Sequence, residues 1–139
     1  MYNTRYFGVY IKEREMASEK IFIITEFADA GDLATMIKKA KNKNEFLPQT
    51  KIFSFLVQIS CGLQYIHKKK ILHRDIKTKN IFLTSQKLIK IGDFGISKSL
   101  SHTMDLATTA IGTPHYLSPE VCSMQPYNHK SDMWGLGMA

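Results

Sequence analysis

The chain has 139 residues, with 19 Lys and Arg against 12 Asp and Glu, so its formal net charge is +7. Its 44% hydrophobic and 11% aromatic residues indicate one globular unit and exclude a disordered tail. The length excludes a large multidomain enzyme. No apolar stretch approaches the ~20 residues that span a bilayer. Because the first residues also lack a signal-peptide pattern, we expect an intracellular protein.

Positive charge is concentrated between residues 36 and 80. This window holds eleven Lys and Arg but only Glu45 and Asp75 as acids, so its charge is +9 and the rest of the chain carries −2. Such a window can attract a polyanion, although most lysines at helix ends are simply solvated. Two cysteines, Cys61 and Cys122, match no metal-binding or redox spacing, and we expect them to be reduced.

The first elements in chain order are two strands and a short helix. Aromatic and β-branched residues dominate residues 4–11 and 21–27, which predicts two antiparallel strands. Asp32 follows a break in this pattern and precedes the apolar residues of 33–37. Its position predicts the N-cap of a short helix.

A long helix is predicted from Pro48, a residue suited to a first helical turn. The apolar residues that follow are spaced by 3, 1, 3, 4 and 3 positions, which predicts one buried stripe. They are Ile52, Phe55, Leu56, Ile59, Leu63 and Ile66. Lysines at 68–70 fit the helix end, where the dipole favours positive charge.

The second half of the chain alternates short elements with a long irregular segment. Residues 80–84 and 88–91, joined by 85–87, predict a β-hairpin. Residues 99–118 show no regular pattern, and a loop of this length indicates a functional or regulated segment. Ser131 with Asp132 predicts the start of another helix.

Three motifs lie around these elements in a fixed order. Residues 73–80 read HRDIKTKN, residues 93–95 read DFG and residues 118–120 read SPE. Together they resemble the catalytic loop, the metal-binding turn and the end of the activation segment of eukaryotic protein kinases. Residues 78–84 and 90–98 are most similar to the NIMA-related kinases within that family.

The resemblance implies the chemistry of phosphoryl transfer. Asp93 and Asn80 would hold Mg²⁺ through hard oxygen ligands, and Asp75 would orient the substrate hydroxyl. Lys77 would offset charge on the γ-phosphate, and Thr113 joins these catalytic residues. Lys77 with Thr113 also implies serine/threonine specificity. A capped turn with surface ion pairs would explain Asp75 alone, but it would not explain Asp75 together with Lys77, Asn80 and Asp93.

Two further roles implied by the resemblance are structural. His73 would pack against Phe94 rather than act as a base. Apart from the resemblance, His67 is expected to be a helix-end residue. Asp132 would hold the catalytic-loop backbone from below.

The resemblance also implies a nucleotide site and a regulatory site. The strand over residues 21–27 resembles the one that leads into the kinase hinge. The implied contacts are Thr25 at the back of the adenine pocket, the backbones of Glu26 and Ala28 at the adenine edge, Asp32 at the ribose and Phe82 at the pocket floor. Phe82 is equally consistent with an ordinary core aromatic. Arg74 would pair with a phosphorylated activation-segment residue, with Thr109 the preferred site and Thr108 the second.

The implied fold is α+β and protein-kinase-like, but partial. Residues 1–27 would form the end of the small lobe. Residues 28–139 would form the hinge, catalytic loop, activation segment and start of the large-lobe central helix. No glycine-rich loop or strand lysine is present in the chain. We therefore expect a fragment of a longer kinase, with negligible activity by itself and an apolar helix stripe that is partly exposed.

Three functions remain as alternatives. The first is an ATP- and Mg²⁺-dependent serine/threonine protein kinase acting on proteins in the cytoplasm, with the cytoskeleton or cilium as a family-based extension. The second is a non-catalytic kinase-like interaction fragment, which intact Asp75, Asn80 and Asp93 disfavour. The third is a nucleic-acid binder acting through the basic window, but no recognition motif accompanies the lysines. We expect no specific nucleic acid and no membrane as partners.

Overall fold

The computed structural model describes residues 2–3, 6–12, 20–94 and 116–139. The strands among these residues are β1 (Tyr6–Lys12), β2 (Lys20–Thr25), β3 (Ile81–Leu83) and β4 (Ile89–Ile91). The helices are α1 (Leu33–Asn42), α2 (Gln49–Lys68), α4 (Pro119–Cys122) and α5 (His129–Met138), with a 3₁₀ turn η1 (Thr78–Asn80) before β3. This mixed architecture agrees with the predicted α+β class.

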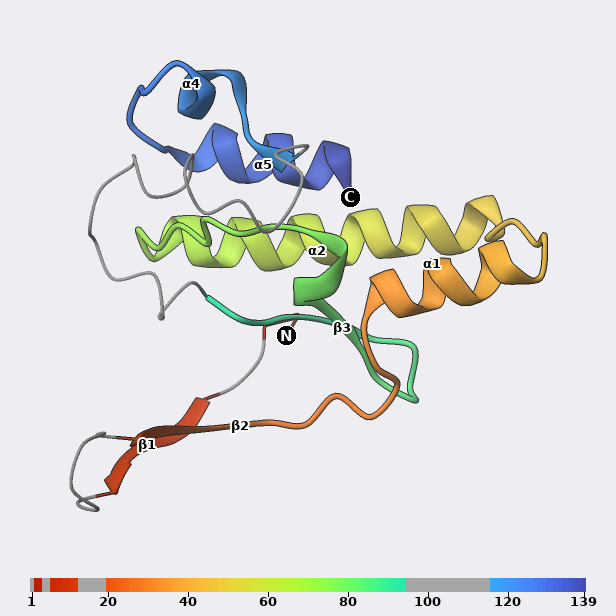
Figure 1. The fold of residues 1–139 in the computed structure, drawn as a ribbon, viewed down its shortest axis with the longest axis horizontal. Coiled ribbons are helices and arrows are strands. Elements are labelled where there is room, and N and C mark those ends of the chain that lie inside the picture. The colour runs from red at the N-terminus through yellow and green to blue at the C-terminus, as the bar shows by residue number, and fades with distance from the viewer. Residues whose placement is uncertain (1, 4–5, 13–19, 95–115) are drawn as a thin grey trace.

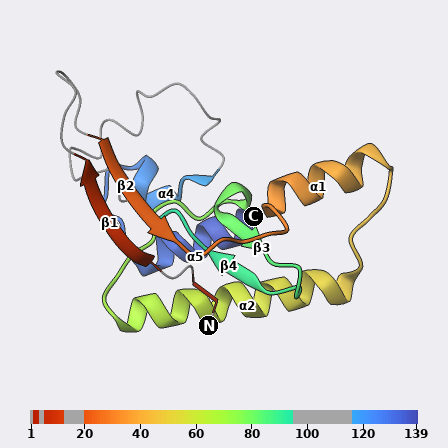
Figure 2. The same cartoon turned by 90° about the horizontal axis from the view of Figure 1, so that it is seen from below.

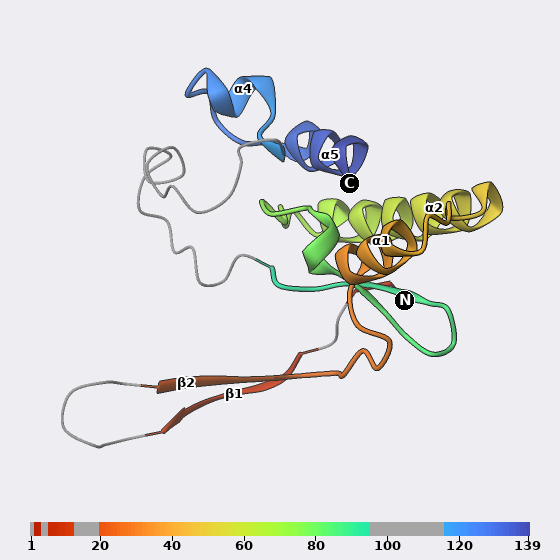
Figure 3. The same ribbon diagram turned by 45° about the vertical axis from the view of Figure 1, so that its right-hand side comes forward.

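The long helix α2 runs through the middle of the molecule, with α5 on one side and the β3–β4 hairpin on the other (Figures 1 and 3). Helix α1 contacts β3, and α2 contacts β4 (Figure 2). The β1–β2 hairpin extends away from the helices (Figure 3). No helix in the described part of the chain is both long enough and apolar enough to cross a membrane.

The two predicted N-terminal strands are confirmed. β1 and β2 pair antiparallel from Tyr6–Thr25 to Lys12–Lys20, with a register shift between Tyr6 and Gly8. Before them, the backbone N–H of Ile91 donates to the carbonyl of Tyr2 at 2.7 Å. The start of the described chain therefore lies along β4.

The predicted cap of α1 is also confirmed. Asp32 is its N-cap, and the carboxylate accepts from the Thr35 backbone N–H at 2.7 Å and from the Thr35 hydroxyl at 3.0 Å. These bonds satisfy donors that the first turn of a helix leaves without intrahelical partners. They also lower the pKa of Asp32.

Helix α2 forms where it is predicted, but part of its predicted stripe is wrong. Phe55, Ile59, Leu63 and Ile66 are buried, whereas Ile52 is 51% exposed and Leu56 is 43% exposed. The buried face passes instead through a polar and a small residue, Gln58 and Gly62. An apolar spacing pattern gives these two residues no weight.

Hairpin contacts explain why Gln58 and Gly62 lie on the buried face. The Gln58 Oε1 accepts from the Ile89 N–H at 2.8 Å. At Gly62, a Cβ atom would lie 2.7 Å from the Cδ1 of Ile91. The missing side chain thus lets β4 pack closely on α2. Phe53 and Val57 of α2 are exposed as well. The exposure of Ile52 and Leu56 agrees with the expectation that the apolar stripe is partly exposed.

The predicted hairpin of β3 and β4 is confirmed, with one face turned toward the core and the other away from it. Both strands alternate buried, half-buried and buried side chains. The register places Phe82 opposite Lys90, so these two share the face that points away from the core. The core combines residues from α1, α2, α5, the hairpin and the loop before η1: Leu33, Phe55, Ile59, Leu63, Ile66, Ile76, Ile81, Leu83, Ile89, Ile91 and Leu136.

Helix α5 begins earlier than the sequence predicts. Asn128 is the N-cap, its side chain accepts from the Lys130 N–H at 2.8 Å, and its own N–H donates to the Ser131 hydroxyl at 3.2 Å. Ser131 therefore completes a capping box at the third helical position instead of starting the helix. The short helix α4 was not predicted.

Gly135 lets α5 approach Ile76 closely, in the loop before η1. A Cβ at this position would lie 2.9 Å from the Ile76 carbonyl oxygen, whereas a Cβ at Gly137 would meet nothing within 4 Å. We expect Gly135→Ala to lower the free energy of unfolding by about 1–3 kcal/mol, because the backbone must move apart. Gly137→Ala should be neutral or stabilising by about 0.5–1 kcal/mol. Urea unfolding of both variants checks this, and equal effects would contradict it.

Candidate active site

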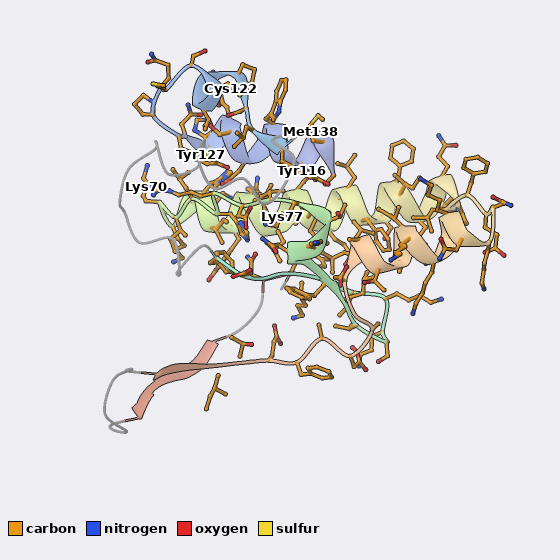
Figure 4. The ribbon with its side chains drawn as sticks, in the orientation of Figure 1. Lys70, Lys77, Tyr116, Cys122, Tyr127 and Met138 are labelled. Atoms are coloured by element: carbon orange, nitrogen blue, oxygen red, sulfur yellow. The ribbon has the colours of Figure 1, made fainter. Side chains whose placement is uncertain are left out.

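The predicted catalytic loop, residues 73–80, brings three predicted catalytic side chains together. The Asp75 Oδ2 accepts from the Lys77 Nζ at 2.7 Å and from the Asn80 Nδ2 at 2.9 Å. The same Asn80 nitrogen donates to the Asp75 backbone carbonyl at 2.8 Å. Asp75 and Lys77 are partly exposed and Asn80 is buried. The Asp75 carboxylate and the Lys77 ammonium group are therefore accessible to solvent, and the buried Asn80 amide holds the carboxylate in place. Lys77 is labelled in Figure 4 on the segment that leads from α2 to β3.

The turn after β4 lies against this loop. The Gly92 N–H donates to the Asn80 carbonyl at 3.1 Å, and the Gly92 carbonyl accepts from the His73 Nε2 at 3.0 Å. Gly92 is thus held from both sides of its backbone. Asp93 follows it with an exposed side chain and a φ of 58°. This left-handed backbone is uncommon without glycine and often occurs at functional sites.

Asn80 and Asp93 suit a magnesium ion. Asn80 donates through its Nδ2, so its Oδ1 can serve as a ligand, and Asp93 adds a carboxylate. The described residues contain no group of three or more His, Cys, Asp or Glu that could hold a metal. Mg²⁺ needs no such group beside a nucleotide, because it keeps several waters and takes phosphate oxygens. The donor set therefore fits the ion implied by the resemblance.

His73 has a structural position. The Asp75 N–H donates to its Nδ1 at 3.3 Å, which leaves the Nε2 as the protonated nitrogen that faces Gly92. Burial lowers the pKa of His73 below its ordinary value, so the ring is neutral near pH 7. Its ring centroid lies 4.8 Å from that of Phe94. The predicted packing is confirmed, and both nitrogens are engaged within the protein.

Asp132 fixes the start of the catalytic loop. Its fully buried carboxylate accepts from the backbone N–H groups of His73 and Arg74, each at 3.0 Å. It also contacts the His67 Nε2 at 2.7 Å and accepts from the Tyr127 hydroxyl at 2.6 Å. The predicted hold on the loop backbone is therefore confirmed. Tyr127 lies beside the start of α5 (Figure 4), and burial together with the Asp132 bond raises its pKa, so it remains a donor.

Arg74 has the second unusual backbone of the site. Its φ is 68°, and a left-handed conformation costs a residue with a side chain roughly 1–2 kcal/mol. The bond from its N–H to Asp132 helps to hold that conformation. The Arg74 side chain is exposed, so its guanidinium can meet an anionic group.

The hinge segment, residues 26–32, is attached to the hairpin by its backbone. The Ala30 N–H donates to the Leu83 carbonyl at 2.9 Å, and the Leu83 N–H donates to the Gly31 carbonyl at 2.8 Å. The Asp29 carboxylate accepts from the Ser85 N–H at 2.7 Å. Hydrogen bonds with the Ser85 side chain and with this N–H lower the pKa of Asp29. These backbone bonds place the hinge segment along the edge of β3.

The predicted nucleotide residues lie in the hinge segment, at the end of β2 and on β3. Phe82 forms an isolated bridge with Asp32, so the predicted floor lies next to the predicted ribose contact. Thr25 ends β2, and Glu26 and Ala28 follow it. The predicted sites Thr108, Thr109 and Thr113 lie outside the described residues.

The family model for the protein kinase domain matches residues 5–139. The chain belongs to the protein kinase family. It is 48% identical to serine/threonine-protein kinase Nek4 of Mus musculus over 117 residues. These residues cover 84% of this chain and 14% of Nek4. It is 49% identical over 119 residues to Nek5 of Homo sapiens, covering 85% and 16%.

A third relative supports the same placement. Nek3 of Mus musculus is 45% identical over 129 residues, which cover 93% of this chain and 25% of that protein. These relatives confirm the resemblance to the NIMA-related kinases. The chain spans only 14–25% of the length of the three curated relatives.

Several contacts of this kinase domain were missed by sequence reasoning. His67 was read only as a helix-end residue, and no local pattern marks Tyr127 as a partner of Asp132. The Ser131 hydroxyl donates to Glu120, a bond that lowers the pKa of Glu120. It ties the end of the activation-segment motif to α5. The pairing of Lys90 with Glu26 was also missed, because 64 positions (90 − 26) separate the two residues.

Proposed function

We propose that this chain is the catalytic part of an ATP- and Mg²⁺-dependent serine/threonine protein kinase of the NIMA-related type. One observation carries the proposal: the Asp75 carboxylate is bonded to both Lys77 and Asn80, and Asn80 is bonded to the residue before Asp93. The names of the relatives, all serine/threonine-protein kinases, support the same reaction. The acceptors would be Ser and Thr hydroxyls of protein substrates.

Some of the chain's own residues would handle the acceptor proton, and others would offset the charge of the phosphoryl group. Asp75 orients the acceptor hydroxyl and takes up its proton, and its contacts with Lys77 and Asn80 set the direction of the carboxylate. Lys77 offsets negative charge as the phosphoryl group moves to the acceptor oxygen. The Asn80 Oδ1 and the Asp93 carboxylate would hold Mg²⁺. MgATP, when bound, supplies the phosphoryl group and neutralises its charge. Thr113 completes the proposed catalytic set.

The nucleotide would lie on the outward face of the hairpin, where Phe82 lies, beside the hinge segment that runs along the edge of β3. The backbones of Glu26 and Ala28 read the adenine edge, Thr25 closes the back of the pocket, and Phe82 forms its floor. Asp32 is engaged with Thr35, yet each carboxylate oxygen has more than one lone pair. It can therefore accept from a ribose hydroxyl and cap α1 at the same time.

Regulation would act through the exposed guanidinium of Arg74. A phosphate on Thr109, or secondarily on Thr108, would carry a charge near −2 and form charge-assisted hydrogen bonds with Arg74. Mass spectrometry of the active protein should find this phosphate. An active protein without phosphate on either threonine would contradict the proposal.

The proposed whole protein is longer than this chain, in keeping with the relatives. It would be cytoplasmic, with the cytoskeleton or cilium as a further location suggested by family resemblance. The alternative function is a non-catalytic kinase-like interaction fragment.

The test uses the full-length protein with MgATP and matched peptides that differ only in a Ser, Thr or Tyr acceptor. We expect phosphate on the Ser and Thr peptides and none on the Tyr peptide, as measured by phosphoamino-acid analysis. Nucleotide binding without transfer to any peptide would favour the non-catalytic alternative. Transfer to the Tyr peptide alone would contradict the serine/threonine assignment.

A further inference from the structure

Lys90 and Glu26 form an ion pair between the hairpin and the hinge segment. The Lys90 Nζ lies 3.1 Å from the Glu26 Oε1, and the two side chains are only 12% and 14% exposed. A surface pair of this kind contributes little, whereas a pair shielded from water strongly constrains its two attachment points. The Lys90–Glu26 pair is of the kind that is shielded from water.

The pair lies on the face of the hairpin that carries the proposed pocket floor. Lys90 is directly opposite Phe82 in the β3–β4 register, so both side chains point away from the core. Lys90 also precedes Asp93 by three positions on the same run of chain. Its ammonium group therefore connects the strand that leads into the metal turn with the segment proposed to read adenine.

The hinge segment has anchors on both sides of Ala28. On its C-terminal side, Asp29 accepts from Ser85, and Ala30 and Gly31 exchange bonds with Leu83. On its N-terminal side, Glu26 is paired with Lys90. The backbone between Glu26 and Asp29 is thus held over the hairpin at both ends.

We infer that the Lys90–Glu26 ion pair positions the hinge backbone for the nucleotide base. The inference rests on the proposed kinase function and assigns Lys90 as a positioning residue that acts through Glu26. Without Lys90, the Glu26 carboxylate would lose this neighbouring positive charge in a position shielded from water, and it would turn toward water. The turn would displace the adjacent backbone, while the Asp75, Lys77 and Asn80 contacts would be unaffected.

The expected result is a loss of nucleotide affinity with little loss of turnover. In the full-length protein, Lys90→Met should raise the Kd for AMP-PNP with Mg²⁺, measured by calorimetry, on the order of tenfold. The KM for ATP should rise in parallel, with kcat within about twofold of its normal value, since uniform binding is lost. Lys87→Met is the matched control, because Lys87 is an exposed lysine of the same hairpin.

Charge reversal separates positioning from mere stabilisation. Glu26→Lys and Lys90→Glu should each weaken AMP-PNP binding, and the double variant should restore most of it. Lys90→Arg, which keeps the charge, should bind nearly normally. These variants also decide the question if Lys90→Met does not fold. A melting temperature that falls while the Kd for AMP-PNP stays unchanged would overturn the inference, as would a double variant that is no better than the single ones.

Failure of the inference can be told apart from failure of the proposed function. An unsubstituted protein that binds AMP-PNP but transfers no phosphate counts against the kinase function, while the comparison of Kd values still decides the role of Lys90. An unsubstituted protein that binds no AMP-PNP overturns both.

Discussion

Asp75→Asn in the full-length protein is expected to lower kcat by about 10²–10⁴-fold, because the amide cannot take up the acceptor proton. Its oxygen can still accept the bonds that the Asp75 carboxylate receives from Lys77 and Asn80, so the loop geometry should persist. The KM for ATP should therefore change by less than about threefold. Steady-state kinetics at saturating peptide gives both constants.

Glu45→Gln is the control for this substitution. It makes the same chemical change at an exposed carboxylate between α1 and α2, away from the catalytic loop, and should leave kcat unchanged. If Asp75→Asn kept full turnover, Asp75 would not be the residue that handles the acceptor proton.

Asp132→Ala is expected to lower the free energy of unfolding by roughly 3–5 kcal/mol, since it strands several buried donors at once. The backbone N–H groups of His73 and Arg74 and the hydroxyl of Tyr127 all lose their acceptor. The left-handed conformation of Arg74 also loses its tether. We therefore expect kcat to fall as well, although Asp132 lies outside the catalytic loop. Urea unfolding measures the first effect and peptide phosphorylation the second.

Met133→Ala provides the comparison on the same helix. Met133 is the next residue of α5 and is exposed, so its truncation should cost less than about 1 kcal/mol. Similar losses of stability in both variants would show that helix α5 is generally sensitive and that the Asp132 network has no special weight.

Local signals in the sequence predicted the elements well. Asp32 and Pro48 each directly precede a helix, both at the N-cap, so Pro48 lies one position before its predicted first-turn place. Such starts can be predicted because they depend on residues only a few positions away. The grouping of Asp75, Lys77 and Asn80 could also be predicted, because they lie within six consecutive residues and their contacts with one another are local. Only the family resemblance, however, assigned these residues a reaction.

Contacts between distant segments could not be predicted in the same way. Ile52 and Leu56 were wrongly placed in the buried stripe because α2 meets β4 at Gly62 and through Gln58. The bond between His67 and Asp132 joins residues 65 positions apart, and a basic residue at a helix end already has a sufficient local reason.

Backbone conformation was hidden for a different reason. Arg74 and Asp93 have positive φ angles without being glycine. Asp adopts a left-handed backbone more often than most residues, but not often enough to predict it, and Arg gives no sign of it. In both, backbone bonds set by tertiary contacts override the local preference. Arg74 is held by Asp132, and Asp93 follows a glycine held by His73 and Asn80.

The decisive measurement is the transfer of labelled γ-phosphate from ATP to a Ser or Thr peptide, followed over a Mg²⁺ titration in the unsubstituted full-length protein and in Asp93→Ala. Transfer should require Mg²⁺ in the unsubstituted protein. In Asp93→Ala it should fall by at least about 10³-fold, because developing phosphate charge loses its metal support. Undiminished transfer by Asp93→Ala, or transfer that ignores Mg²⁺, would contradict the proposed site.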